Sequence, residues 1–298
     1  MRMNLFKILG AVCLFYSCSA QSTQVSLKPN ADNNSLLWEV SGKGLNRSSY
    51  LFGTFHLMCK DDIRFSNQLK TAVKNADTVY LEMDMDNPAT MLSALFLMNM
   101  KNGKTLQELY TKDEFNRINT FFKDSLHMPV TMFEKMKPMF LVALLYPKMM
   151  PCKRVSGVEE ELMKLVKEQK KEINGLETIE FQASVFDSIP YQEQANELLK
   201  SIDSMAINKK YFDTMMNVYK SQKINEIEKL FNSKEMGVEE HQDLLLNNRN
   251  NNWVAQLNKL MRNGSVFVAV GAGHLVGKEG LISLLLKAGY RVKPLYNK

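Results

Sequence analysis

Short apolar runs, bounded by glycine, asparagine and proline, recur along the chain from residue 36 onward. Runs of this length are typical of β-strands, and they predict six: 36–40, 49–53, 78–83, 171–176, 265–270 and 290–294. The runs around Val79 and Val268 are nearly continuous, which indicates strands buried on both faces. Gly42, Gly44 and Asn46 separate the first two runs and predict a hairpin with a longer loop.

Helical periodicity fills the intervals between these strands. Apolar residues recur at three- and four-residue spacing and predict helices over 66–75, 89–100, 112–126, 132–145, 159–169, 193–203, 239–261 and 280–288. Because the strands come from distant parts of the chain, we predict an α/β or α+β fold around a central mixed sheet. We expect one domain over 36–298, with two long helical insertions at about 88–150 and 188–245.

The N-terminal segment has the pattern of a secretory signal peptide over residues 1–20. Arg2 and Lys7 precede an apolar run at 8–16, which is shorter than the ~20 residues of a membrane-spanning helix. The polar residues at 21–35 lack periodicity and predict a linker. We therefore expect an exported protein, periplasmic or extracellular.

Two processing routes are open for this segment. Ala20 closes a small-residue cleavage pattern, so the mature chain is expected to begin at Gln21. The alternative is lipoprotein processing at Cys18, which would leave a lipid anchor at the new N-terminus. No later stretch approaches 18 uninterrupted apolar residues, so we expect no membrane span in the mature protein.

Composition and charge narrow the classes of partner. The 298 residues are 45% hydrophobic and 23% charged, which is the profile of an ordinary folded protein. The net charge of +6 falls to about +4 without the two basic residues of the signal peptide, and both signs are interspersed. We therefore expect no nucleic-acid partner.

Cysteine usage agrees with export. After removal of the signal peptide, the chain keeps Cys59 and Cys152, an even pair in an oxidising compartment. We predict that they form a disulfide, and the alternative is two buried thiols that do not meet.

Two of the four histidines occupy matching positions. His56 ends Gly53-Thr54-Phe55-His56 and His274 ends Gly271-Ala272-Gly273-His274, each directly after a predicted buried strand. Such strand ends meet at the edge where α/β sheets bind ligands, so the two imidazoles could ligate a metal or act as acid and base. The alternative is two ordinary loop histidines. We expect His274, as a loop residue at the edge of the sheet, to contribute little to core packing. The HExxH, GxSxG, P-loop and GxGxxG motifs are absent.

A carboxylate ends a third strand. Glu82 reaches the same edge if the strands are parallel neighbours, and Asp84 and Asp86 are rival candidates, with Asp86 expected in solvent. Two histidines and one carboxylate are a common ligand set for Zn, Mn, Co or Fe. We predict that His127 and His241 lie elsewhere.

Several motifs together resemble the TraB/PrgY/GumN family, which includes the Tiki proteins. They are the two GxxH motifs, Glu82, Gly157-Val158-Glu159, Gly175-Leu176-Glu177-Thr178 with Glu180 and Gln182, Arg249-Asn250 before Trp253, and Gly277, Gly280-Leu281 and Gly289-Tyr290. The resemblance spans about residues 36–295. It implies an erythromycin-esterase/ChaN-like α/β fold. Tiki members are metal-dependent proteases, using Mn or Co, that cleave the N-terminal region of Wnt ligands, and PrgY and TraB members limit peptide pheromone activity.

The resemblance also implies roles for individual residues. His56, Glu82 and His274 match the metal-site positions, and Arg249 matches the family arginine. Arg249 could hold a substrate carboxylate or stabilise an oxyanion, or it could form a structural ion pair with Glu177 or Glu82. Glu177 could be a general base for metal-bound water or an acid at a helix N-terminus.

The function predicted from these residues is hydrolysis by an exported, metal-dependent enzyme, most simply a peptidase in which metal-activated water attacks a carbonyl. We interpret Glu159 as an acid at a helix N-terminus. The cofactor would be a divalent Mn, Co or Zn ion and the partner a peptide or protein substrate. Two alternatives are a non-catalytic protein that sequesters a peptide or small ligand, and an esterase acting on a non-peptide substrate.

Overall fold

A six-stranded mixed sheet forms the centre of the structure, a computed structural model that describes residues 34–231 and 241–298. The strand order is β6-β4-β7-β2-β1-β8, from β1 (Leu37–Ser41), β2 (Ser49–Thr54), β4 (Thr78–Met83), β6 (Ile173–Glu177), β7 (Val266–Gly271) and β8 (Arg291–Pro294). The four strands from β6 to β2 are parallel, and β1 runs antiparallel to β2 and β8. The predicted mixed sheet of chain-distant strands is confirmed.

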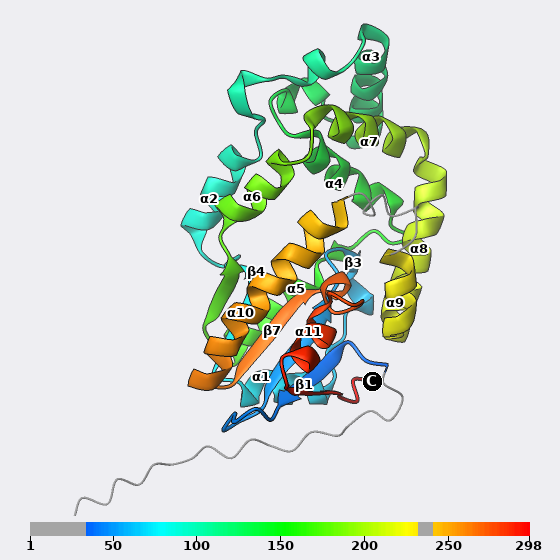
Figure 1. Cartoon of the computed structure of the whole chain (residues 1–298). Coiled ribbons are helices and arrows are strands. Elements are labelled where there is room, and N and C mark those ends of the chain that lie inside the picture. Colours follow the sequence, from blue (N-terminus) through cyan, green and yellow to red (C-terminus); the bar gives the residue numbers. More distant parts are fainter. Residues whose placement is uncertain (1–33, 232–240) are drawn as a thin grey trace, which may run out of the picture.

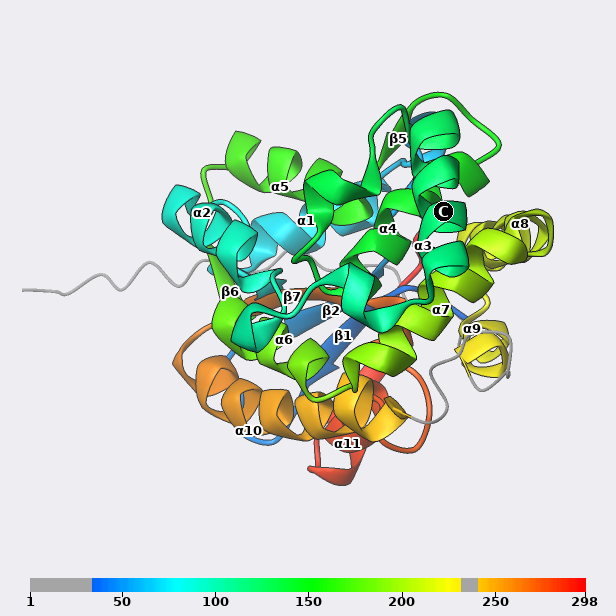
Figure 2. The ribbon, with the colours of Figure 1, turned by 90° about the horizontal axis from the view of Figure 1, so that it is seen from above.

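Helices cover both faces of the sheet (Figures 1 and 2). They are α1 (Asn67–Asn75) and α5 (Val158–Glu168) on one face, and α10 (Asn248–Asn263) and α11 (Leu281–Lys287) on the other. The side chains of β7 alternate between two apolar clusters. Phe267 and Ala269 pack with α1 and α5, whereas Val268 and Val270 pack with α10 and α11. Burial of β7 on both faces, predicted from its unbroken apolar run, is confirmed.

Most of the remaining helices lie beyond the C-terminal ends of the parallel strands, and α9 (Ile224–Phe231) lies beside the sheet at the level of α11 (Figure 1). The others are α2 (Pro88–Leu97), α3 (Lys112–Phe121), α4 (Pro138–Met149), α6 (Ile179–Asp187), α7 (Tyr191–Asp203) and α8 (Met205–Ser221). A third cluster, with Leu141 and Leu145 of α4 against Ala195 and Leu198 of α7, holds part of this layer together. None of the helices in the described ranges is long and apolar enough to cross a membrane.

Some boundaries differ from the sequence predictions for clear reasons. The helix expected over 132–145 begins at Pro138, because proline fits the first helical position and disfavours helix in the residue before it. The helix expected over 239–261 begins at Asn248, after a π-helical turn at Asp243–Asn247. The short pair β3 (Met58–Cys59) and β5 (Val155–Ser156) was not predicted. The predicted signal peptide, its cleavage sites and nearly all of the linker lie outside the described residues.

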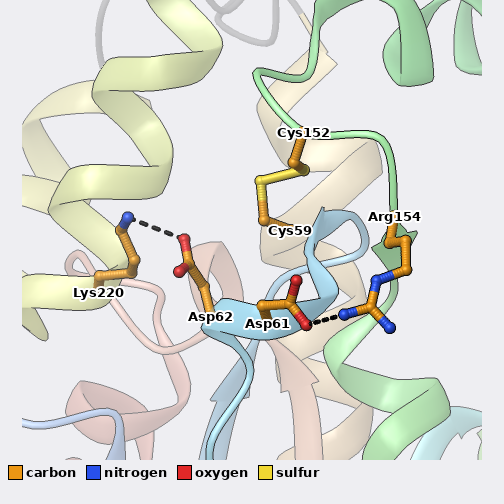
Figure 3. Close-up of a disulfide and its surroundings, with 6 residues drawn as sticks. All are labelled: Cys59, Asp61, Asp62, Cys152, Arg154 and Lys220. Carbon is orange, nitrogen blue, oxygen red and sulfur yellow. Dashed lines mark hydrogen bonds and ion pairs between the residues drawn. A yellow bond between two sulfur atoms is a disulfide. The ribbon is translucent and has the colours of Figure 1, made fainter.

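The predicted disulfide is confirmed. Cys59 and Cys152 are bonded, with 5.8 Å between their Cα atoms, and the bond joins β3 to the segment just before β5 (Figure 3). Asp61 and Arg154 form an ion pair on the same two segments, at 2.5 Å. The disulfide therefore ties together the chain that leaves the first GxxH motif and the chain that enters α5.

Candidate functional site

The two GxxH motifs lie side by side. Their strands β2 and β7 are parallel neighbours, and Thr54 pairs with Gly271 in register. A Cβ atom on Gly53 would lie 2.9 Å from Leu275 Cδ1 and 3.2 Å from Ala272 Cα, so the glycine is needed for the turns to approach each other. The backbone therefore delivers both histidines to one edge of the sheet.

His274 is held by an amide in a defined tautomer. Its Nδ1 atom lies 2.7 Å from Asn250 Oδ1, and the Nδ2 of Asn250 donates to the carbonyl oxygen of Glu279 at 2.8 Å. Because that bond orients the amide, the amide oxygen faces His274 and accepts a hydrogen bond from the protonated Nδ1. The Nε2 atom is thus unprotonated, and its lone pair faces Arg249 Nη1 at 3.3 Å.

Burial makes His274 part of the core, and the expectation that it contributes little packing is wrong. It is 4% exposed, and its ring lies on the indole of Trp253 with 4.5 Å between centroids. This burial lowers the pKa of His274 to about 3, with the charge of Glu82 opposing the effect and that of Arg249 reinforcing it. The ring is therefore neutral at physiological pH, the state that a metal ligand requires.

His56 has a different setting. About 76% of its side-chain surface is open to the cavity, and its Nδ1 lies 2.7 Å from Glu159 Oε1, which also accepts from Thr54 Oγ1 at 2.6 Å. A carboxylate can only accept, so Nδ1 carries the proton and Nε2 faces the site. Surrounding protein lowers the pKa of His56, but the hydrogen bond and charge of Glu159 outweigh this and raise it to about 9. His56 therefore carries a proton on both ring nitrogens at neutral pH, and binding a metal through Nε2 would release one of them.

Glu82 completes the convergence from β4, the parallel neighbour of β7. Its Oε1 accepts from Gly271 N at 2.9 Å. A methyl group on Gly271 would lie 3.4 Å from Glu82 Oε1, 3.7 Å from His56 Nε2 and 3.8 Å from His274 Cδ2. The structure thus brings all three predicted side chains around one point above Gly271.

Arg249, in the first turn of α10, binds the carboxylates of Glu82 and Glu177. Its Nη2 donates to Glu82 Oε2 at 2.7 Å and to Glu177 Oε2 at 2.8 Å, while Nε donates to Glu177 at 3.0 Å. Of the roles left open for Arg249, the structure shows the ion pair, and it includes both glutamates. Nη1 donates to Leu245 O at 3.0 Å and lies 3.3 Å from His274 Nε2. Burial alone would raise the pKa of Glu82, but the neighbouring imidazole and guanidinium charges hold it well below its usual range.

Glu177, the last residue of β6, faces Arg249 rather than the cavity. Its side chain is 5% exposed, and both oxygens accept from the guanidinium. Gln182 of α6 donates to Glu177 at 3.3 Å and to Glu82 at 3.4 Å. This position suits a residue that orients Arg249 better than a general base.

The site includes three residues for which the sequence predicted no role in it. Glu159 is in the first turn of α5, as interpreted, but its carboxylate holds His56. Asn250 and Gln182 were visible only as parts of family motifs. A polar residue beside a motif histidine is a signal for such roles, but its partner is fixed only by the fold.

The other candidates lie away from this convergence. Asp84 accepts from the backbone of Asp86, and Asp86 is exposed and pairs with Lys167 at 3.4 Å. His127 is an exposed residue that ends a helical turn in a left-handed conformation. His241 pairs with Glu193 of α7 at 3.1 Å. None of these four candidates lines the cavity described next.

A cavity of about 580 Å³ opens in front of the convergence. His56, Glu82, Glu159 and Arg249 form its polar end. Its remaining wall is mainly apolar, from the segment after β4, from α5 and α6, and from the turn before α10. Such a shape, with a few convergent polar groups in an apolar cleft, is typical of a ligand or active site.

The residues present fit a divalent metal ion by their donor chemistry. In the described part of the chain, no group of three or more His, Cys, Asp or Glu side chains is already spaced as a metal site. Nε2 of His56, the ring of His274 and the ionised carboxylate of Glu82 nevertheless border the space above Gly271. Both histidines also have Nδ1 anchored by an oxygen acceptor, the arrangement that orients metal-ligating histidines.

Comparisons with known proteins agree with the motifs. A family model described as the TraB/PrgY/gumN family matches residues 36–294. A Danio rerio protein named Metalloprotease TIKI2 is 23% identical over 350 residues, covering 96% of this chain and 67% of the relative. The Shigella flexneri protein named Uncharacterized protein YbaP is 24% identical over 246 residues, covering 80% and 88%. A Xenopus tropicalis Metalloprotease TIKI2 is 29% identical over 102 residues, covering 34% and 19%.

Proposed function

The chain belongs to the TraB/PrgY/gumN family, and from this premise we propose that it is an exported, metal-dependent hydrolase that cleaves peptides or proteins. Similarity to proteins named as metalloproteases supports the hydrolytic class. The disulfide between Cys59 and Cys152 supports an oxidising compartment, and so export.

The observation that carries the proposal is the space above Gly271. Gly271 has φ −47° and ψ 135°, which any residue can adopt, and a methyl group there would make only ordinary contacts. Neither backbone conformation nor crowding therefore requires glycine. We assign the glycine to the need for open space between three metal-binding side chains. His56, Glu82 and His274 would hold a divalent cation in that space.

The other residues of the site would support the bound cation in different ways. A bound divalent cation supplies Lewis acidity, which polarises a carbonyl group and makes water a better nucleophile. Glu159 and Asn250 keep the two imidazoles in the tautomer that presents Nε2. Arg249 keeps Glu82 ionised and in place. In the absence of a cation, Arg249 Nη1 donates to Leu245 O and to the Nε2 lone pair of His274. When His274 holds the cation through that lone pair, this Nη1 proton is released for a substrate oxygen.

Metal content of the freshly purified protein, with cleavage of a peptide library after addition of Mn²⁺ or Co²⁺, tests the proposal. His56→Ala and His274→Ala should each lose metal and hydrolysis. The matched control is His127→Ala, an exposed histidine outside the cavity, which should keep both. Tight peptide binding without turnover or metal, in the wild-type protein, would instead support a sequestering protein.

Gly271→Ala gives a sharper test. Because the methyl group contacts nothing closer than 3.4 Å, the fold and its unfolding free energy should be preserved. The same methyl group occupies the space between the donors, so metal affinity and hydrolysis should fall together. A Gly271→Ala protein with full metal occupancy would contradict the assigned position.

A further inference from the structure

We propose that the apolar wall of the cavity is a subsite for one apolar side chain of a peptide, at a position adjacent to the cleaved bond. Leucine, methionine and phenylalanine are the side chains that fit it. This inference rests on the proposed peptidase function, and it adds to that function a sequence preference.

Apart from Gln182 and the half-exposed Glu160, which pairs with Lys164, the side chains that line the cavity away from its polar end are apolar. These apolar side chains come from the exit of β4, from α5, from α6 and from the turn before α10: Met83, Met85, Met163, Val185, Phe186 and Leu245. At the other end stand the carboxylates, His56 and Arg249. A ligand that fills this cavity must therefore present a polar, reactive group at one end and apolar surface next to it.

Two structural links show that the apolar wall and the polar end of the cavity are adjacent. Leu245 belongs to the wall, and its carbonyl oxygen accepts from Arg249 Nη1 at 3.0 Å. Gln182 contacts Glu82, while Val185 and Phe186 lie three and four positions further along the same helix and so on the same face. A carbonyl at the polar end therefore has its own or the neighbouring residue's side chain against the wall.

The composition of the wall predicts breadth within the apolar class. Met83, Met85 and Met163 are unbranched and polarisable, and such side chains adapt to ligands of different shape. Leucine, methionine and phenylalanine should therefore be accepted to similar extents. A charged or amide side chain placed against Met83, Met85 and Met163 would lose its hydration without gaining a partner there. The polar lining residues Glu160 and Gln182 are already paired, with Lys164 and with Glu82 and Glu177.

Cleavage of a peptide set that differs at one position tests the subsite. The set carries Leu, Met, Phe, Gly, Asp or Lys, and products are identified by mass spectrometry with Mn²⁺ present. We expect kcat/KM for Leu, Met and Phe to exceed that for Gly and Asp by roughly tenfold or more at a position adjacent to the cut. Equal cleavage of all six peptides would overturn the subsite and leave the proposed function standing.

Matched variants locate the preference on the wall. Met163→Glu should lower kcat/KM for the Leu peptide by roughly tenfold and raise it for the Lys peptide. Met132→Glu is the control, since Met132 is 67% exposed and outside the cavity, and its preference should match the wild type. Leu245→Glu is a second wall variant with the same expected loss. A preference unchanged in both wall variants would overturn the proposal.

Binding to the metal-free protein separates the two failures. Fluorescence anisotropy of the same labelled peptides, with chelator present, should rank Leu, Met and Phe above Gly and Asp. If nothing is cleaved but this ranking holds and is lost in Met163→Glu, the subsite stands and the peptidase function fails. If peptides are cleaved without a ranking in either measurement, the subsite fails alone.

Discussion

The two GxxH motifs share their glycine, their histidine and their position at the end of a parallel strand, but the fold buries one histidine and exposes the other. Ala272, Gly273, His274 and Leu275 are all buried, so the second motif is held by packing. The first motif ends in an exposed His56, and its outgoing chain is held by the Cys59–Cys152 disulfide. Equivalent backbone positions on neighbouring parallel strands thus carry one rigid imidazole and one imidazole facing the cavity.

The partners of the rings follow the same division. His274 is bonded to the neutral amide of Asn250, and burial lowers its pKa. His56 is bonded to the carboxylate of Glu159, which raises its pKa. A motif therefore specifies where a histidine arrives, whereas its protonation behaviour depends on residues from other elements. Four changes test this difference, and they follow from the largest expected effect to the smallest.

Arg249→Met should have the largest effect on stability, because it acts on the packed side of the site. Glu82 and Glu177 would remain with 16% and 5% of their side-chain surfaces exposed and without their cation. Leaving buried charges unpaired should lower the unfolding free energy by about 3–5 kcal/mol in urea denaturation. Arg117→Met removes an exposed pair with Asp203 and should cost less than ~1 kcal/mol. Equal losses in the two variants would show that the cluster is not buried as described.

Removal of the disulfide should act on the other motif. Serine at both Cys59 and Cys152 should lower the unfolding free energy by about 2–4 kcal/mol, since the closed loop is long. In the folded state, imidazole NMR signals of His56 should broaden or shift, while those of His274 stay in place. A shift at His274 alone would contradict the assignment of the disulfide to the first motif.

Much of this architecture follows from the sequence. The nearly continuous apolar runs around Val79 and Val268 predicted strands buried on both faces. This holds for β7, whereas β4 is buried at Val79 and Leu81 and only half-buried at Thr78 and Tyr80. The shared glycine-to-histidine endings of β2 and β7 predicted a common edge. The even cysteine pair predicted the disulfide. These signals are local or involve simple counting, so they need no knowledge of packing.

The rest depends on contacts between distant segments. Glu159 is 103 residues from His56, and Glu82 is 167 residues from Arg249, and no local pattern joins them. Glu159 has the sequence context of an ordinary first-turn helix acid, so its bond to His56 became visible only when α5 was placed beside β2. The burial of His274 was missed because the loop after β7 turns inward onto Trp253 of α10.

Truncating each ring should separate the motifs by stability. His274→Ala removes a buried ring packed on Trp253 and should cost about 2 kcal/mol of unfolding free energy. His56→Ala removes a mostly exposed ring, but it also removes the hydrogen bond to the buried Glu159 carboxylate, so it should cost about 1 kcal/mol. Urea denaturation of both variants, without metal, is the measurement. A larger loss for His56→Ala would reverse the comparison.

The smallest and most direct effect is on protonation. In metal-free protein, His274 has a folded pKa of about 3, below its ordinary value of 6.5, so the unfolded chain binds more protons in that interval. Its contribution to stability is present above pH 6.5 and is lost as the pH falls toward 3. His56 has a raised folded pKa, so its contribution is present below pH 6.5 and is lost as the pH rises through that pKa.

Exchanging the partners of the two rings should bring their titrations closer together. Glu159→Gln removes the carboxylate that faces His56 and should lower the pKa of His56. Asn250→Asp replaces the amide oxygen that lies 2.7 Å from His274 Nδ1 by a negatively charged oxygen and should raise the pKa of His274. Imidazole NMR titration with chelator present resolves both rings, and exposed His127 serves as the internal reference. If wild-type His56 and His274 titrated together near 6.5, the partners would not control protonation, and the two motifs would be equivalent after all.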